Sequence, residues 1–184
     1  MPELSALTLT FFSVISTGLA ETTPAKKVPM NNINKVFLGF NRPKSFLFNQ
    51  LNSQLKNYSG GLMINWFLVG HYLEDDHWYL EKEEGGRVLG NLCHWTDATL
   101  NLIGIDKAFP LEINPTFIKD SDSDFVITIT FNDGSTAVFS FSAKGWVSKG
   151  IIESLRIQKG DCVASLESFD KLTIDAKGFN KVWK

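Results

Sequence analysis

One turn constrains the folding of this chain more than any other short stretch. Residues 132–135, Asn-Asp-Gly-Ser, separate two runs of alternating apolar residues, Phe125 to Thr130 and Thr136 to Ser142. Asp-Gly between such runs is a strong signal for a β-hairpin, because glycine adopts the positive φ of a tight turn without strain. The second half of the chain therefore has to contain antiparallel β-structure.

Further strands are predicted on both sides of this hairpin, from apolar and aromatic runs of strand-forming residues. The N-terminal ones form a meander over 62–73, 77–83 and 87–95, with turns at 74–76 and 85–86, and a fourth strand over 100–105. The segment 148–157 suits either a short helix or a strand, whereas 162–166 and 171–174 suit short strands.

One segment has helical spacing instead. Between residues 44 and 58, Leu47, Leu51, Leu55 and Tyr58 recur three or four positions apart, and the segment ends at Ser59-Gly60-Gly61. The preceding residues 32–40 read as a strand. We therefore predict an α+β fold with one main N-terminal helix packed on a mostly antiparallel β-meander, roll-like or sandwich-like. This element order resembles that of cystatin-like folds.

The chain of 184 residues suits one such domain, over 32–184. Residues 1–31 contain a segment that suits either a signal peptide or a strand, followed by a polar linker. Its apolar run and the small residues up to Ala20 favour a signal peptide, whereas Glu3 and the lack of Lys or Arg oppose one. If residues 1–20 are cleaved, the protein is exported, periplasmic or secreted; otherwise it is cytoplasmic. The run is too short and too polar for a stable transmembrane anchor.

All three histidines lie within residues 70–95. If Gly85-Gly86 forms the two-residue turn of a hairpin, His77 faces His94 across the strands. A three-residue turn at 74–76 then adds His71 to the same face, beside Tyr79 and Glu81. Cys93 points to the opposite face from His94, so the two form no catalytic dyad on a strand. Two interpretations of this patch follow. His71, His77 and His94 hold zinc or another divalent metal, or they belong to a polar binding surface with Tyr79 and Glu81.

The two cysteines allow one disulfide, Cys93 to Cys162, in an oxidising compartment; in a reducing one each suits a small buried hydrophobe. The net charge is −2 and no basic stripe is present, so we expect no nucleic-acid partner. No G-x-S-x-G, Walker loop or dinucleotide fingerprint occurs, which removes the sequence signals for serine hydrolases, P-loop proteins and dinucleotide-binding domains.

We therefore expect a non-catalytic binding protein that recognises another macromolecule, such as an inhibitor, an immunity-type protein or a small exported effector, with another protein as the partner. No catalytic residue or cofactor is assigned, and an enzyme is the less favoured class. The alternative is a metal-binding protein or metal-dependent enzyme that uses the three histidines. A third hypothesis is a small-ligand carrier with an aromatic-lined pocket.

Overall fold

The computed structural model describes residues 40–74, 76–78, 88–117, 124–148 and 150–184. Its centre is an eight-stranded sheet in the order β2-β3-β4-β1-β5-β6-β7-β8. The strands are β1 (Met63–Val69), β2 (Leu111–Phe117), β3 (Asp124–Phe131), β4 (Thr136–Ser142), β5 (Ile152–Lys159), β6 (Cys162–Glu167), β7 (Lys171–Ala176) and β8 (Phe179–Trp183).

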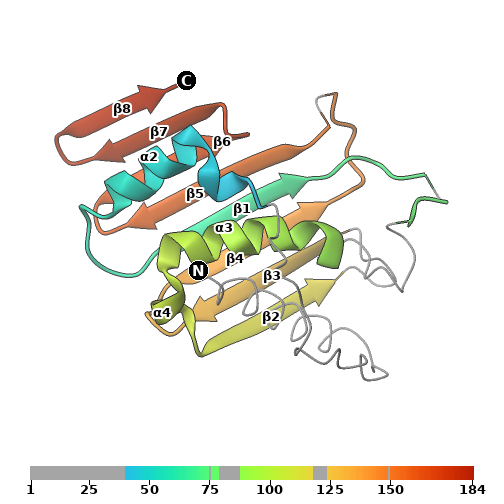
Figure 1. Ribbon diagram of the computed structural model, residues 1–184, viewed down its shortest axis with the longest axis horizontal. Coiled ribbons are helices and arrows are strands. Elements are labelled where there is room, and N and C mark those ends of the chain that lie inside the picture. The colour runs from blue at the N-terminus through green and yellow to red at the C-terminus, as the bar shows by residue number, and fades with distance from the viewer. Residues whose placement is uncertain (1–39, 75, 79–87, 118–123, 149) are drawn as a thin grey trace, which may run out of the picture.

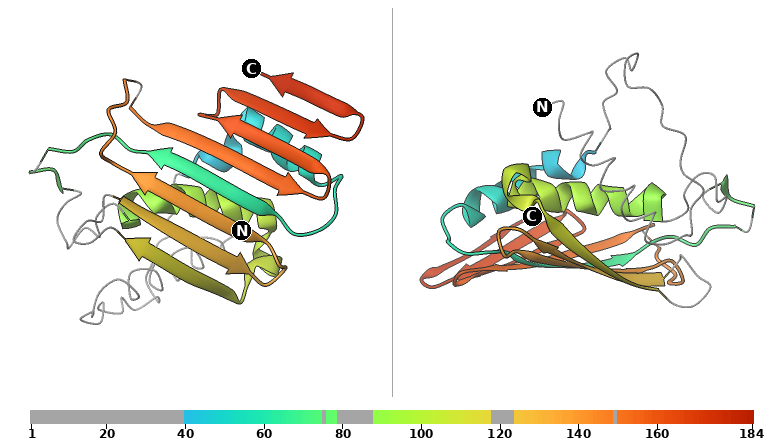
Figure 2. Two further views of the ribbon diagram at one scale, coloured as in Figure 1. Left: turned by 180° about the vertical axis from the view of Figure 1, so that it is seen from behind. Right: turned by 90° about the horizontal axis from the view of Figure 1, so that it is seen from below.

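The sheet is mixed, and β1 lies at its centre (Figure 1). β1 pairs with β4 in parallel and with β5 antiparallel, while every other neighbouring pair is antiparallel. The described helices all lie on one face of the sheet (Figure 2). The opposite face carries no helix from the described residues, so alternate side chains of β1, such as Met63 and Phe67, are exposed there.

The helical layer consists of α2 (Phe46–Leu55), α3 (Cys93–Ile103) and the short α4 (Ile105–Ala108). A 3₁₀ turn, η2 (Arg42–Lys44), precedes α2, and a π-helical turn, η5 (Val88–Leu92), leads into α3. Ser45 caps α2, because its side chain accepts a hydrogen bond from the backbone N–H of Phe48. None of the described helices is long and apolar enough to cross a membrane.

The core lies between the helices and the sheet. Trp66 and Leu68 of β1, Phe139 of β4 and Leu155 of β5 are all almost fully buried on the covered face. α2 packs over β6 and β7, with Leu47, Phe48, Leu51 and Leu55 buried at helical spacing. α3 is tied to β1 by a hydrogen bond from Trp66 Nε1 to Thr99 Oγ1 of 3.0 Å. The helix beginning at Cys93 is therefore fixed on the central strand.

The predicted fold class is wrong. The chain does not place one N-terminal helix on an antiparallel meander; its described residues form a mixed eight-stranded sheet with the described helices on one face. The main reason is the segment predicted to hold strands at 87–95 and 100–105. The described part of it, from Val88 to Ile103, is helical and ends at Gly104, whose φ is 91°.

Tertiary burial explains this error. α3 is rich in residues that suit strands, such as Trp95, Thr96, Thr99 and Ile103, and all four are buried. Leu92, Trp95, Leu100 and Ile103 are buried at helical spacing, but polar residues such as Thr96 and Thr99 are buried among them and interrupt the apolar stripe in the sequence. Packing against the sheet outweighs the weak intrinsic preferences of these residues.

Other predicted elements are confirmed. The hairpin is β3 and β4, and Gly134 in its turn has a φ of 83°. The helix predicted over 44–58 is α2, and the segment 148–157, which suited either a helix or a strand, overlaps the strand β5. The predictions for residues 1–31 and 32–39, and for most of 77–83, lie outside the described residues.

Candidate functional site

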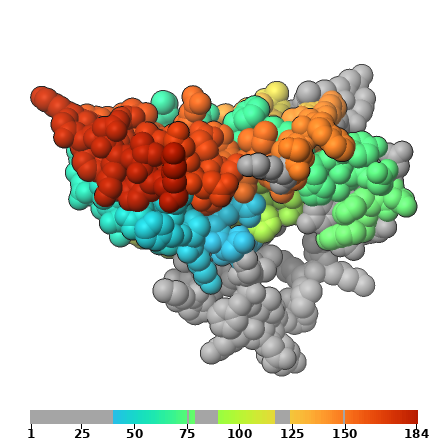
Figure 3. Space-filling view, turned by 90° about the horizontal axis from the view of Figure 1, so that it is seen from above, coloured from blue at the N-terminus to red at the C-terminus, as the bar shows by residue number. Residues whose placement is uncertain are grey.

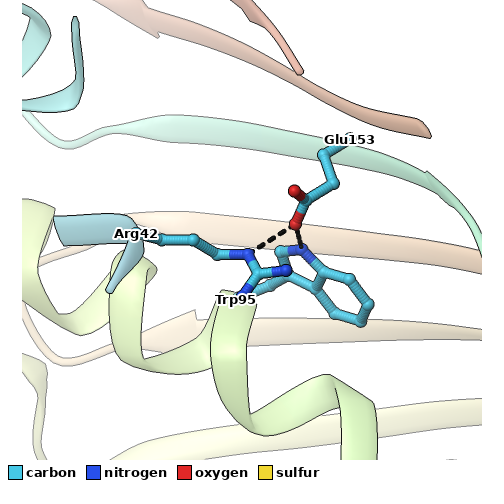
Figure 4. Close-up of polar contacts among 3 residues, drawn as sticks. All are labelled: Arg42, Trp95 and Glu153. Carbon is cyan, nitrogen blue, oxygen red and sulfur yellow. Dashed lines mark hydrogen bonds and ion pairs between the residues drawn. The ribbon is translucent and has the colours of Figure 1, made fainter. Parts of the chain in front are cut away.

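A cluster of polar and aromatic side chains lies at the N-terminal end of α3. His94 and Trp95 occupy the first turn of that helix, Arg42 comes from η2, and Glu153 comes from β5. Three segments far apart in the sequence therefore meet at one point on the covered face of the sheet (Figure 4). We call these four residues the His94 cluster.

Glu153 is the centre of the polar contacts. Its Oε1 accepts hydrogen bonds from Arg42 Nε and from Trp95 Nε1, both at 2.5 Å (Figure 4). The guanidinium carbon of Arg42 also lies 5.4 Å from the centre of the Trp95 ring, close enough for a cation–π interaction. The side chains of Arg42 and Glu153 are only 14% and 15% exposed, so water screens their attraction weakly.

The placement of Glu153 follows from strand alternation. Glu153, Leu155 and Ile157 share the covered face of β5, and the two aliphatic residues are buried. A carboxylate that takes the place of an apolar side chain on a covered face needs a partner, because an unpaired buried charge is costly. Arg42 and Trp95 supply that partner.

His94 is half-buried beside this ion pair. The ring of Phe40 meets its imidazole edge-on, with centroids 5.5 Å apart. Nδ1 of His94 is buried and has no hydrogen-bond partner within the described part of the chain. Burial lowers the pKa of His94, the positive charge of Arg42 lowers it further, and the carboxylate of Glu153 opposes them. The imidazole is therefore neutral near neutral pH and able to take up a proton.

A pocket of about 250 Å³ adjoins the cluster, lined by Asn41, Arg42, Ser45, Glu153, Ser168 and Phe169. A larger hollow of about 390 Å³ lies at β1, β4 and β5, where the exposed Phe67 marks the open face, and Arg156 is the one titratable residue in its lining. The smaller pocket is the better candidate for chemistry, because it shares Arg42 and Glu153 with the His94 cluster.

The structure separates the predicted site residues from one another. His94 lies in a helix and not on a strand, so the predicted face-to-face pair with His77 is wrong. His77 stacks on Trp78 and His71 is exposed, both in the segment 70–78, which lies at the opposite end of the molecule from β8 (Figure 3). Tyr79 and Glu81 lie outside the described residues.

The described residues support neither the predicted metal site nor the predicted disulfide. In the described residues, which include His71, His77 and His94, no three His, Cys, Asp or Glu side chains are grouped to hold a metal ion. Cys93 and Cys162 are both free thiols, so the disulfide considered for an oxidising compartment is not formed. Burial raises the pKa of the Cys93 thiol to about 11, which makes this cysteine a poor nucleophile.

The sequence interpretation found His94 but missed Arg42, Trp95 and Glu153. One signal was present for Glu153, which stands in phase with Leu155 and Ile157 in a strand-like segment. Nothing in the sequence links Arg42 to Glu153, because the two residues are 111 positions apart.

Solved structures of oxidoreductases and dehydrogenases are among those that resemble this chain. A candidate oxidoreductase from Thermotoga maritima matches with a TM-score of 0.67 at 12% sequence identity, over 79% of this chain and 47% of that one. UDP-N-acetylglucosamine 3-dehydrogenase from Acidithiobacillus ferrooxidans matches with a TM-score of 0.60 at 16% identity, over 79% and 45%. An NAD binding oxidoreductase from Klebsiella pneumoniae matches with a TM-score of 0.59 at 14% identity, over 79% and 45%.

At these identities the likeness establishes the fold alone, and the chain spans less than half the length of those proteins. No protein-family profile and no curated protein matches the sequence. The structural likeness nevertheless overturns the expectation of a non-catalytic binding protein and of a small secreted protein-binding domain, because the neighbours are dehydrogenases and oxidoreductases.

The described residues do not fit a nicotinamide dinucleotide. Dinucleotide-binding domains cradle the pyrophosphate in a glycine-rich turn between a parallel strand and a helix. Here only β1 and β4 are parallel among the described strands, and the sequence has no G-x-G-x-x-G. Any nicotinamide cofactor would have to be held by residues outside this sheet.

Proposed function

We propose that this chain forms the substrate-side part of an oxidoreductase-type enzyme, in which His94 exchanges a proton with a hydroxyl or carbonyl group of the substrate. The fold likeness to oxidoreductases supports the enzyme class. The observation that carries the proposal is the neutral, half-buried imidazole of His94 beside the Arg42–Glu153 pair.

The proton step suits this environment. Conversion of an alcohol to a carbonyl removes a hydride, which an acceptor held outside the described residues would have to take, and the hydroxyl proton, which needs a base. An imidazole that is neutral near pH 7 is a common base. Because Nδ1 of His94 is buried, Nε2 is the ring nitrogen that would face a substrate. The edge-on contact with Phe40 restricts the His94 ring, which favours one orientation toward an incoming group.

The experiment that tests this proposal is ligand screening by NMR on the full chain. The imidazole signals of His94 are followed while a panel of hydroxy and keto compounds is added. We expect at least one compound to shift the His94 signals and to lose its binding in His94→Asn. Nicotinamide nucleotides alone should not bind, because the described residues lack a dinucleotide cradle.

The matched control is His71→Asn, which changes an exposed histidine outside the cluster. This variant should bind the same compounds as the unchanged chain. The proposal is wrong if no hydroxy or keto compound shifts the His94 signals, or if His94→Asn binds the compounds as tightly as the unchanged chain.

A further inference from the structure

The Arg42–Glu153 pair has a consequence for which chemical groups the site accepts. Glu153 neutralises a guanidinium that would otherwise stand as an uncompensated cation beside His94 and the adjoining pocket. We propose that Glu153 is a positioning and specificity-determining residue, which makes the site select an uncharged polar group over an anion. This inference rests on the proposed function, since it assumes that the substrate reaches His94.

The hydrogen-bond geometry supports the positioning role. Two donors from different elements, Arg42 Nε and Trp95 Nε1, meet on the single oxygen Oε1 of Glu153. Trp95 follows His94 directly in the first turn of α3, so the contact with Glu153 also fixes the backbone that carries the imidazole. A mostly buried carboxylate with two donors is held in one place, as a positioning residue requires.

The charges around His94 support the specificity role. Arg42 from η2 and Glu153 from β5 act on the imidazole with opposite sign, and Cys93 and Asp97 share its helix. Asp97 carries a raised pKa because of burial. The unopposed charge of Arg42 would repel a protonated His94 and attract any small anion.

The lining of the adjoining pocket points the same way. Apart from Arg42 and Glu153, the pocket is lined by Asn41, Ser45, Ser168 and Phe169, none of which is charged. An entering carboxylate or phosphate would meet a cation already paired with Glu153 and would be repelled by that carboxylate. An uncharged hydroxyl or amide meets no such repulsion, so the pocket suits an uncharged polar ligand.

The test is Glu153→Gln in the full chain, which keeps an oxygen acceptor for Trp95 but removes the negative charge. The pKa of His94 is measured by NMR titration without ligand, and inorganic phosphate is then added as an anion probe. We expect a lower His94 pKa than in the unchanged chain. We also expect phosphate to shift the His94 signals of Glu153→Gln but not those of the unchanged chain.

Two further variants complete the design. Arg42→Gln should raise the pKa of His94 and show no response to phosphate. The matched control is Glu167→Gln on β6: Glu167 pairs in register with Ser154, so it points to the opposite face from Glu153. This control should change neither readout.

The proposal is overturned if Glu153→Gln and Glu167→Gln leave the same His94 pKa, or if phosphate binds the unchanged chain as well as it binds Glu153→Gln.

Should Glu153→Gln fail to fold, the double variant Arg42→Gln/Glu153→Gln removes the lone buried cation. The double variant should then show no phosphate response and a higher His94 pKa than the unchanged chain. The reason is that Arg42 lowers the pKa of His94 more than Glu153 raises it, so removing both charges leaves burial as the main cause of the lowered pKa. These titrations need no substrate, so they separate a failure of this inference from a failure of the proposed function.

Discussion

The bond between Trp66 and Thr99 predicts how strongly α3 is held on the sheet. Both residues are 1% exposed, and Trp66 Nε1 donates to Thr99 Oγ1 over 3.0 Å. Thr99→Val keeps nearly the same shape but removes the acceptor, which leaves the indole N–H buried without its partner. Such an orphaned donor costs about 1–3 kcal/mol.

For a chain of this size, we expect the midpoint of thermal unfolding to fall by roughly 2–12 °C. Urea unfolding followed by far-ultraviolet circular dichroism measures the free energy directly. Thr99→Ser keeps the hydroxyl and should therefore destabilise less than Thr99→Val. The matched control is Thr130→Val, at an exposed position of β3, which should change the free energy of unfolding by no more than about 0.5 kcal/mol.

A double-mutant cycle with Trp66→Phe isolates the bond itself. Because each single change leaves a buried group unpaired, the double variant should cost less than the sum of the single variants by at least about 0.5 kcal/mol. Additive costs, or a Thr99→Val variant as stable as Thr130→Val, would refute the argument that this hydrogen bond holds α3 on β1.

Three further expectations follow from buried groups. Burial raises the pKa of Asp97 to about 6 from 3.8, so the folded chain binds the proton more tightly than the unfolded chain. Stability should therefore fall, by about 3 kcal/mol at most, as the pH rises through that interval, and urea unfolding of Asp97→Asn should lack this fall. Burial also raises the thiol pKa values of Cys93 and Cys162, so a thiol reagent at neutral pH should modify the native chain far more slowly than the unfolded chain; equal rates would contradict this. Finally, a Cβ on Gly61 would lie 3.1 Å from the backbone of Gly134, so Gly61→Ala should destabilise the chain by about 1 kcal/mol or more in urea unfolding, and an unchanged midpoint would count against this packing.

Local signals in the sequence were reliable where one short-range pattern decides the structure. The Asp-Gly turn produced the β3–β4 hairpin, and the leucine spacing produced α2. They failed at α3, where residues that prefer strands are helical because they are buried against the sheet. The predicted histidine pair is wrong for the same reason, since His94 lies at the N-terminus of a helix and not on a strand face.

The sequence by itself determined the hairpin, the first long helix and the lack of a dinucleotide fingerprint, and it identified His94 as a candidate site residue. Only the tertiary structure decided the mixed strand order and the partners of His94, because Arg42 and Glu153 approach each other only when η2, α3 and β5 pack together. The physical reason is that turns and amphipathic stripes arise from contacts within a few residues. A buried ion pair depends instead on segments 111 positions apart, whose meeting no local pattern encodes.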